Sequence, residues 1–153
     1  MKPRICVPLP VERLSDLAPM INRAGDTGAD LIELRLDYLK GDILSQMDDV
    51  KKAISQAPVP LIATNRMRNQ GGKRIQKEDR RIQTLVKAAK VGFQYVDVEL
   101  VTANVTAITK KIIDSGSKPI ISFHDFKSTP KDSEMEGIVN SEIKVGASIC
   151  KLV

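Results

Sequence analysis

The chain has 153 residues, a hydrophobic content of 42% and a formal net charge of +5. This length suits one ordinary core, and we expect a single domain over residues 1–153. No apolar run reaches the roughly 18 residues that a membrane span needs, and the N-terminal apolar stretch is too short for a secretory signal. We therefore expect a cytoplasmic protein with no membrane partner.

The sequence holds one histidine and two cysteines, Cys6 and Cys150, which lie far apart. Zinc sites need several such ligands at short spacings, so no metal site of the usual kind is expected. Both cysteines lie in apolar, strand-like segments. The role expected for each is that of a small buried hydrophobe.

Short apolar runs alternate with longer helical patterns, which is typical of repeated βα units on a parallel sheet. Aromatic residues make up only 3% of the sequence, so the core must be built from aliphatic side chains. The predicted strands are Arg4 to Leu9, Leu31 to Asp37, Pro60 to Met67, Tyr95 to Leu100, Pro119 to Phe126 and Ala147 to Val153.

The helices between these strands carry their own signals. One helix is predicted over Asn104 to Asp114, because Ser115 and Gly116 follow it and end it. In the helix before the fourth strand, apolar residues at helical spacing predict the face that packs on the sheet: Ile82, Leu85, Val86 and Ala89. Basic residues of the same helix are expected on its solvent face: Lys77, Arg80, Arg81 and Lys87.

Two architectures contain such units: an open doubly wound sheet and the first part of an eight-stranded barrel. Strand alternation favours the barrel, because Glu33, Arg35 and Asp37 share one face of the second predicted strand. Three charges are hard to bury under a helix, whereas a barrel interior that opens into a polar site accommodates them. The sequence therefore predicts an α/β fold, a (β/α)8 TIM barrel of which about six βα units are present. It is incomplete at the C-terminal end, since a full barrel needs about 200 residues or more.

Lys151 lies between apolar neighbours near the end of the last predicted strand. Burying an unpaired ammonium is costly, and only a neutral amine attacks a carbonyl to form an imine. A lysine in such a sequence is therefore a candidate nucleophile. The other interpretation is a strand-end lysine whose amine reaches solvent.

His124 lies near the end of the fifth predicted strand, with Ser122 on the same face. Histidine is the side chain best suited to exchange a proton near neutral pH, although a lone histidine in a core or on a surface needs no such role. If both strands belong to one sheet, His124 and Lys151 lie at similar heights on neighbouring strands. A base would then stand beside an imine.

Glu33, Arg35 and Arg66 supply hydrogen-bonding groups for a hydroxylated or carboxylated ligand, because a guanidinium matches a carboxylate. An internal ion-pair network is equally compatible with these residues. The stretch from Arg66 to Arg74 predicts a mobile basic loop, and its two adjacent glycines are only a weak signal for phosphate binding. Because this loop lacks interleaved aromatic residues, no nucleic-acid partner is expected, and the net charge also suits an anionic small molecule.

Several segments occur in the order seen in one enzyme family: ICVPL, GADLIELRLDYL, ATNRMRNQGG, YVDVEL, SFHDFKSTP and ASICKLV. The combination of ELRLD, FHDF and a lysine 27 residues after that histidine is specific. On these residues the chain resembles the type I 3-dehydroquinate dehydratases. The resemblance implies a hydro-lyase that converts 3-dehydroquinate to 3-dehydroshikimate and water through a lysine Schiff base, in the shikimate pathway of aromatic amino acid biosynthesis. It implies no metal or dissociable cofactor.

By position, the resemblance implies that Lys151 forms the imine with the ketone of the substrate and that His124 removes the adjacent proton. It further implies that Glu33, Arg35 and Arg66 bind the polar groups of the substrate. The chemistry agrees with these roles, because a protonated imine makes the neighbouring C–H acidic enough for an imidazole to remove its proton.

The chain also departs from the family pattern. Gln70 stands where many members carry an acidic residue that orients the histidine, and Pro8 stands where some carry a serine near the substrate. The last two βα units of the family barrel, with an arginine for the substrate carboxylate and a closing loop, are missing. An open sheet exposes two edges, so we expect further polypeptide, element swapping or a homodimer to cover them.

Two other functions remain compatible with the sequence. Another class I Schiff-base barrel, such as an aldolase, also places its lysine on the sixth strand, and one acting on sugar phosphates needs a phosphate site in its late loops. A noncatalytic interaction module comes from a different class, and the missing units and Gln70 favour it. Reductive trapping of 3-dehydroquinate, followed by mass spectrometry of the modified peptide, separates these functions.

Overall fold

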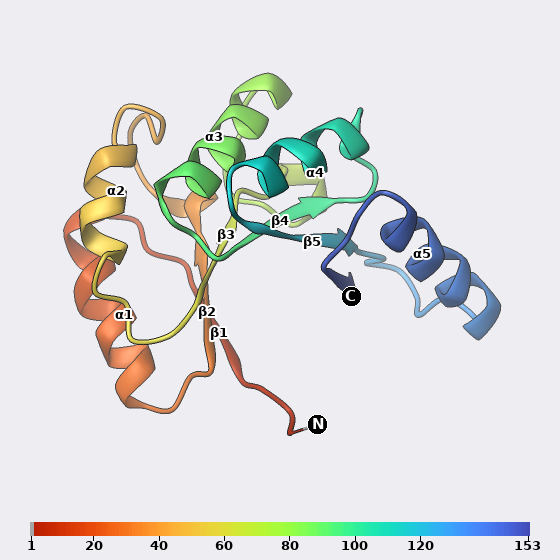
Figure 1. Cartoon of the computed structure of the whole chain (residues 1–153), viewed down its shortest axis with the longest axis horizontal. Coiled ribbons are helices and arrows are strands. Elements are labelled where there is room, and N and C mark those ends of the chain that lie inside the picture. Colours follow the sequence, from red (N-terminus) through yellow and green to blue (C-terminus); the bar gives the residue numbers. More distant parts are fainter. Residues whose placement is uncertain (1) are drawn as a thin grey trace.

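A computed structural model describes residues 2–153 of the chain (Figure 1). Its strands are β1 (Cys6–Leu9), β2 (Leu31–Arg35), β3 (Leu61–Thr64), β4 (Tyr95–Glu99), β5 (Lys118–Phe123) and β6 (Ile149–Leu152). Its α-helices are α1 (Leu17–Asp26), α2 (Met47–Ile54), α3 (Glu78–Val91), α4 (Val105–Asp114) and α5 (Asp132–Lys144). Short 3-10 helices lie at η1 (Leu14–Asp16), η2 (Leu36–Tyr38) and η3 (Arg68–Gln70). Each predicted strand therefore corresponds to a strand of the structure.

The strands form one parallel sheet in the order β1-β2-β3-β4-β5-β6. This order distinguishes a barrel from a doubly wound sheet, in which the strand order reverses. The sheet curls, and the helices lie along its outer side from α1 to α5 (Figure 1). The predicted α/β barrel with six units is confirmed, in the form of a half-barrel whose edge strands are β1 and β6.

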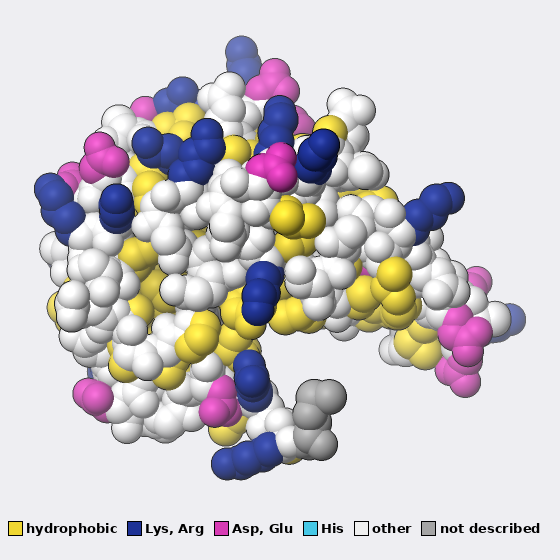
Figure 2. Space-filling model, in the orientation of Figure 1, with side chains coloured by type: hydrophobic (Ala, Val, Ile, Leu, Met, Phe, Trp, Pro, Cys, Tyr) yellow, Lys and Arg dark blue, Asp and Glu magenta, His cyan; other side chains and the backbone are white. Residues whose placement is uncertain are grey.

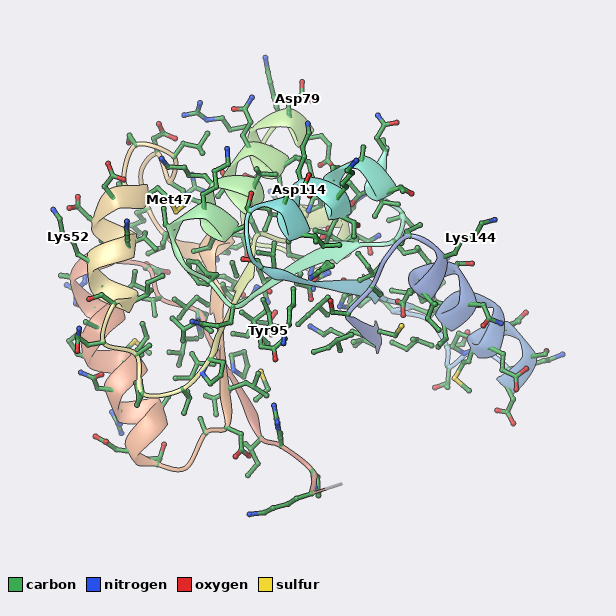
Figure 3. The ribbon with its side chains drawn as sticks, in the orientation of Figure 1. Met47, Lys52, Asp79, Tyr95, Asp114 and Lys144 are labelled. Atoms are coloured by element: carbon green, nitrogen blue, oxygen red, sulfur yellow. The ribbon has the colours of Figure 1, made fainter. Side chains whose placement is uncertain are left out.

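The core lies between the outer face of the sheet and the helices. Alternate strand residues point outward and are buried there: Leu34, Ala63, Val96, Val98 and Ile121. Aliphatic side chains of the helices pack against them, as the low aromatic content requires. Figure 3 shows Lys52, Asp79 and Lys144 projecting outward from their helices, whereas Tyr95 lies on the inner side of the curled sheet.

The inner side of the sheet stays open between the two edge strands. Figure 2 shows a hollow in the molecular outline between the N-terminal segment and α5, with hydrophobic side chains along its wall. Cys6 points to this inner side from the edge strand β1 and is exposed. The prediction of a buried Cys6 is therefore wrong, because an edge strand lacks a neighbour on one side. Cys150 is partly buried.

The predicted solvent face of α3 is wrong at Arg81. The Arg81 side chain is fully buried, and its guanidinium donates hydrogen bonds to Glu99 at 2.5 Å and to Glu78 at 2.8 Å. A buried cation is tolerated when it is paired and hydrogen-bonded, so two carboxylates keep Arg81 inside. The buried face of α3 is turned accordingly and is made of Arg81, Thr84, Leu85, Ala88, Ala89 and Val91.

The second strand is shorter than predicted, because β2 ends at Arg35 and Asp37 lies in η2. The Asp37 carboxylate is nevertheless buried and accepts hydrogen bonds from Arg35 Nε at 2.9 Å and Arg35 Nη2 at 2.8 Å. This local ion pair forms where the chain leaves the sheet, so Asp37 does not continue the face of the strand.

Within residues 2–153, no helix has the length and apolar character needed to cross a membrane.

Candidate active site

The strand register places many polar residues on the inner face of the sheet. In a parallel pair, residues that lie side by side point to the same face. Arg35 lies beside Thr64, Thr64 beside Asp97, and Ser122 beside Lys151. With the alternation along each strand, the inner face carries Glu33, Arg35, Thr64, Asp97, Glu99, Ser122 and Lys151.

Lys151 points its amine at two carboxylates. Its Nζ donates a hydrogen bond to Asp97 Oδ2 at 3.2 Å and lies 3.6 Å from Glu33 Oε1. The Lys151 side chain is 31% exposed. The sequence neighbours of Lys151 are apolar, but the amine itself meets carboxylates, because adjacent strand residues point to the opposite face.

Arg66 is the most connected cation of the site. It follows β3 by two residues, and its side chain is 4% exposed. Nη2 donates to Asp97 Oδ2 at 2.9 Å, and Nη1 donates to Ser122 Oγ at 2.8 Å. Nη1 also lies 3.5 Å from Glu99 Oε1. The internal ion-pair network that the sequence left open is therefore present around Arg66.

His124 follows β5 directly and lies beside Arg66. Its Nδ1 is 3.4 Å from Arg66 Nη1, and its ring stacks on Phe126 with 6.0 Å between the ring centroids. Burial, and after it the charge of Arg66, lowers the pKa of His124 from 6.5 to about 4. The imidazole is therefore neutral at neutral pH, which is the form that accepts a proton.

Glu33 and Arg35 occupy the same strand but have different partners. Glu33 Oε1 accepts a hydrogen bond from Thr64 Oγ1 at 2.6 Å and faces Lys151. Arg35 is held by Asp37, and its Nη2 donates to the Gly71 carbonyl at 3.2 Å. Contacts therefore join Glu33, Arg66, His124 and Lys151 into one cluster. Arg35 shares their face of the sheet but binds the loop after β3.

Gly71 and Gly72 allow the basic loop to turn tightly after Arg66. Gly71 has a φ of +81°, and a Cβ added to Gly72 would lie 2.0 Å from the Arg66 carbonyl oxygen. Gly72 N donates to the Met67 carbonyl at 2.8 Å. Nearby, Lys73 N donates to Asp37 at 2.8 Å. The loop thus turns tightly just after Arg66 and is hydrogen-bonded to the segment after β2. Gln70 lies at the end of η3 and is half-buried.

Asp97 and Ser122 belong to this cluster, although the sequence reasoning did not select them as site residues. Asp97 accepts hydrogen bonds from Arg66, Lys151 and Ser122. The available signal was strand alternation, which places Asp97 and Glu99 together on one face of a strand whose other residues are mostly apolar. It shows that two acids lie inward, but not which cations they meet.

Known proteins resemble this chain over nearly its whole length. The family model described as type I 3-dehydroquinase matches residues 5–153. A 3-dehydroquinate dehydratase from Methanobrevibacter smithii is 35% identical over 143 residues, which cover 94% of this chain and 61% of that protein. One from Methanosarcina barkeri is 36% identical over 135 residues, which cover 85% of this chain and 56% of that protein.

Solved structures share the fold. The crystal structure of type I 3-dehydroquinate dehydratase from Clostridium difficile with covalently modified comenic acid is 25% identical, with a TM-score of 0.91 over 99% of this chain and 62% of that chain. Deoxyribose phosphate aldolase from Aeropyrum pernix, at 15% identity and a TM-score of 0.67 over 97% of this chain and 61% of that one, shares the fold alone.

The chain spans 61% of the length of the Methanobrevibacter smithii relative and 62% of the Clostridium difficile protein. The family model covers this chain except for its first four residues. The resemblance seen in the sequence is confirmed, and the chain belongs to the type I 3-dehydroquinase family.

Proposed function

We propose that this chain carries out the dehydration of 3-dehydroquinate to 3-dehydroshikimate, with Lys151 forming an imine with the substrate. The reaction belongs to the shikimate pathway. The observation that supports this most is the position of the Lys151 amine on the inner face of the sheet, 3.2 Å from Asp97 and 3.6 Å from Glu33. Relatives in the same family are named 3-dehydroquinate dehydratases.

The first step joins Lys151 to the substrate. The neutral amine adds to the ketone carbon, and the ketone oxygen leaves as water, so that a C=N bond replaces the C=O bond. The carboxylates of Glu33 and Asp97 lie within reach of the proton that the ammonium gives up. When the imine nitrogen is protonated, it withdraws electrons from the adjacent carbon.

The second step transfers a proton to His124. Because its pKa is lowered to about 4, the ring is neutral and takes the proton from the carbon beside the iminium. The electron pair moves onto nitrogen to give an enamine, which then expels the neighbouring hydroxyl group. The imidazolium returns its proton to that leaving oxygen, and water departs. A second water then hydrolyses the imine, which releases the unsaturated ketone and frees Lys151.

Glu33, Arg35 and Arg66 are proposed to bind the substrate. Glu33 is 14% exposed, so its carboxylate can accept a hydrogen bond from a hydroxyl group while it keeps its bond from Thr64. Arg35 is 19% exposed beside the loop after β3 and offers a cation to an anionic ligand. Arg66 is buried and holds His124 and Lys151 in place through its contacts with His124 and Asp97.

Reductive trapping tests the proposal. The chain is incubated with 3-dehydroquinate and sodium borohydride, and the modified peptide is identified by mass spectrometry. We expect the adduct on Lys151 and its loss in Lys151→Ala. Lys144→Ala is the matched control, because Lys144 is exposed on α5 and projects away from the sheet (Figure 3). An adduct on another lysine overturns the assignment, and trapping of deoxyribose phosphate in place of 3-dehydroquinate favours the aldolase alternative.

A further inference from the structure

We propose that Asp97 is the counter-ion of the Lys151 nitrogen, both as the ammonium of the free protein and as the iminium of the bound state. This inference rests on the proposed imine at Lys151 and adds a residue outside the predicted site. Asp97 lies in the middle of β4, and its side chain is 1% exposed. It contacts the reacting nitrogen directly, at 3.2 Å.

The hydrogen bonds of Asp97 show that its carboxylate is built to be charged. Oδ1 accepts from Ser122 Oγ at 2.7 Å, and Oδ2 accepts from Arg66 Nη2 at 2.9 Å and from Lys151 Nζ at 3.2 Å. Burying an ionised carboxylate is costly unless it is both paired and hydrogen-bonded, and Asp97 meets both conditions. Its donors come from three other strands or their ends, so the register of the sheet fixes its position.

A single oxygen of Asp97 serves two cations. Arg66 and Lys151 both donate to Oδ2, so their charges lie close together and repel each other in a buried setting where electrostatic interactions are strong. The negative charge between them offsets that repulsion. Glu33 is a poorer candidate for this role, because it is 14% exposed, lies 3.6 Å from Lys151 and is also bound by Thr64.

The same position suits the imine. When the amine has condensed with a ketone and the imine is protonated, the positive charge is again on nitrogen, which remains beside Oδ2 of Asp97. The adjacent C–H is acidic only while that nitrogen is protonated. A fixed carboxylate favours the protonated imine and so assists proton removal by His124. Asp97 therefore acts through charge, and an uncharged side chain of the same shape should not replace it.

Substitution at Asp97 with a readout that needs no substrate tests this. Lysine amines of the whole chain are reductively methylated with ¹³C-formaldehyde and sodium cyanoborohydride. The methyl signal of Lys151, identified by its loss in Lys151→Ala, is followed against pH by NMR. In Asp97→Asn the midpoint of that signal should lie at a lower pH than in the unsubstituted protein, because an opposite charge within reach favours the charged form. Asp97→Glu keeps the charge, so its midpoint should stay closer to that of the unsubstituted protein.

Ser122→Ala is the matched control. It removes the hydrogen bond that Ser122 donates to Asp97 and the one that it accepts from Arg66, but it leaves every charge in place, so the midpoint should move less than in Asp97→Asn. A midpoint in Asp97→Asn equal to that of the unsubstituted protein overturns the counter-ion, as does an equal shift in Ser122→Ala. A general disturbance of the fold would move both variants alike.

A second measurement covers the case in which Asp97→Asn does not fold. The carboxyl carbon of Asp97 is labelled with ¹³C in the unsubstituted chain, and its signal should respond to the titration of Lys151 and lose that response in Lys151→Met. A signal that ignores Lys151 overturns the proposal. A midpoint shift without trapping of 3-dehydroquinate supports the ion pair and contradicts the proposed function, whereas trapping without a shift contradicts the counter-ion alone.

Discussion

The guanidinium of Arg66 and the imidazole of His124 are in contact, with 3.4 Å between Arg66 Nη1 and His124 Nδ1. Arg66 cannot move away readily, because Asp97 holds the other nitrogen of its guanidinium at 2.9 Å. A fixed positive charge next to a half-buried ring opposes protonation of that ring. This relationship contributes to the lowered pKa of His124 and keeps the ring neutral.

Replacing Arg66 should raise the pKa of His124. The expected midpoint is about 4 in the unsubstituted chain and higher in Arg66→Gln, where burial still lowers it but the neighbouring charge is gone. His124 is the only histidine in the sequence, so its ring signals in a proton NMR titration are unambiguous. Arg66→Lys keeps the charge and is the control. If the His124 midpoint in Arg66→Gln equals that in the unsubstituted chain, the charge of Arg66 does not act on His124.

The depressed pKa of His124 also sets a pH dependence of stability. The folded value of about 4 lies below the ordinary value of 6.5, so the folded chain binds this proton less readily than the unfolded chain. The contribution of His124 to the free energy of unfolding is therefore complete above pH 6.5 and is lost as the pH falls toward 4. Urea unfolding at several pH values measures this. Between pH 6.5 and 4, the free energy of unfolding should fall less in His124→Gln than in the unsubstituted chain.

Arg81→Met should destabilise the fold strongly. Arg81 is fully buried and pairs with Glu99, so its removal leaves a buried carboxylate without its main partner, a change that costs about 3–5 kcal/mol. Arg80→Met is the control at the adjacent position, because Arg80 is 51% exposed and its pair with Asp42 is worth about 1 kcal/mol or less. Urea unfolding measures both variants. Equal losses at the two positions would contradict the role of burial.

Glu142→Gln should stabilise the chain at alkaline pH. Glu142 is fully buried on α5, and burial raises its pKa by more than the nearby Cys150 thiol and Lys151 backbone lower it. A raised carboxyl pKa contributes stability below the ordinary value and loses it as the pH rises through the folded value. The variant should gain about 1 kcal/mol at pH 8 and nothing at pH 4, measured by chemical unfolding. Glu136→Gln, on the exposed face of the same helix, should change little at either pH.

Gly72→Ala should lower stability by more than about 1 kcal/mol and disturb the site. An added Cβ would lie 2.0 Å from the carbonyl oxygen of Arg66, so the backbone that carries this arginine must shift. Gly137→Ala is the opposite control, because nothing lies within 4 Å of an added Cβ in the middle of α5. There alanine should gain about 0.5–1 kcal/mol by its helix preference. Thermal unfolding and the His124 titration together check both effects, since only Gly72→Ala should move the histidine signal.

Local patterns in the sequence determined the fold class and the inward face of the strands. Apolar runs separated by helical spacing identify parallel βα units, and alternation places Glu33 and Arg35 on one side of β2 because the side-chain period of a strand is two. It also predicts similar heights for His124 and Lys151, and in the structure Lys151 pairs with Ser122, two residues before His124. These features depend on neighbours in the chain, so they can be read without coordinates.

Only the tertiary structure decided which charges meet. Arg81 was expected in solvent because helix spacing carries no information on a carboxylate from another strand, and Glu99 holds it inside. Lys151 has apolar neighbours in sequence, yet its amine meets Asp97, which precedes it by 54 residues. Pairs at this separation arise from strand register and sheet curl, and the cost of leaving a buried charge unpaired selects them. For that reason the pairing of the strands, and not the local sequence, decides the environment of each ionisable group.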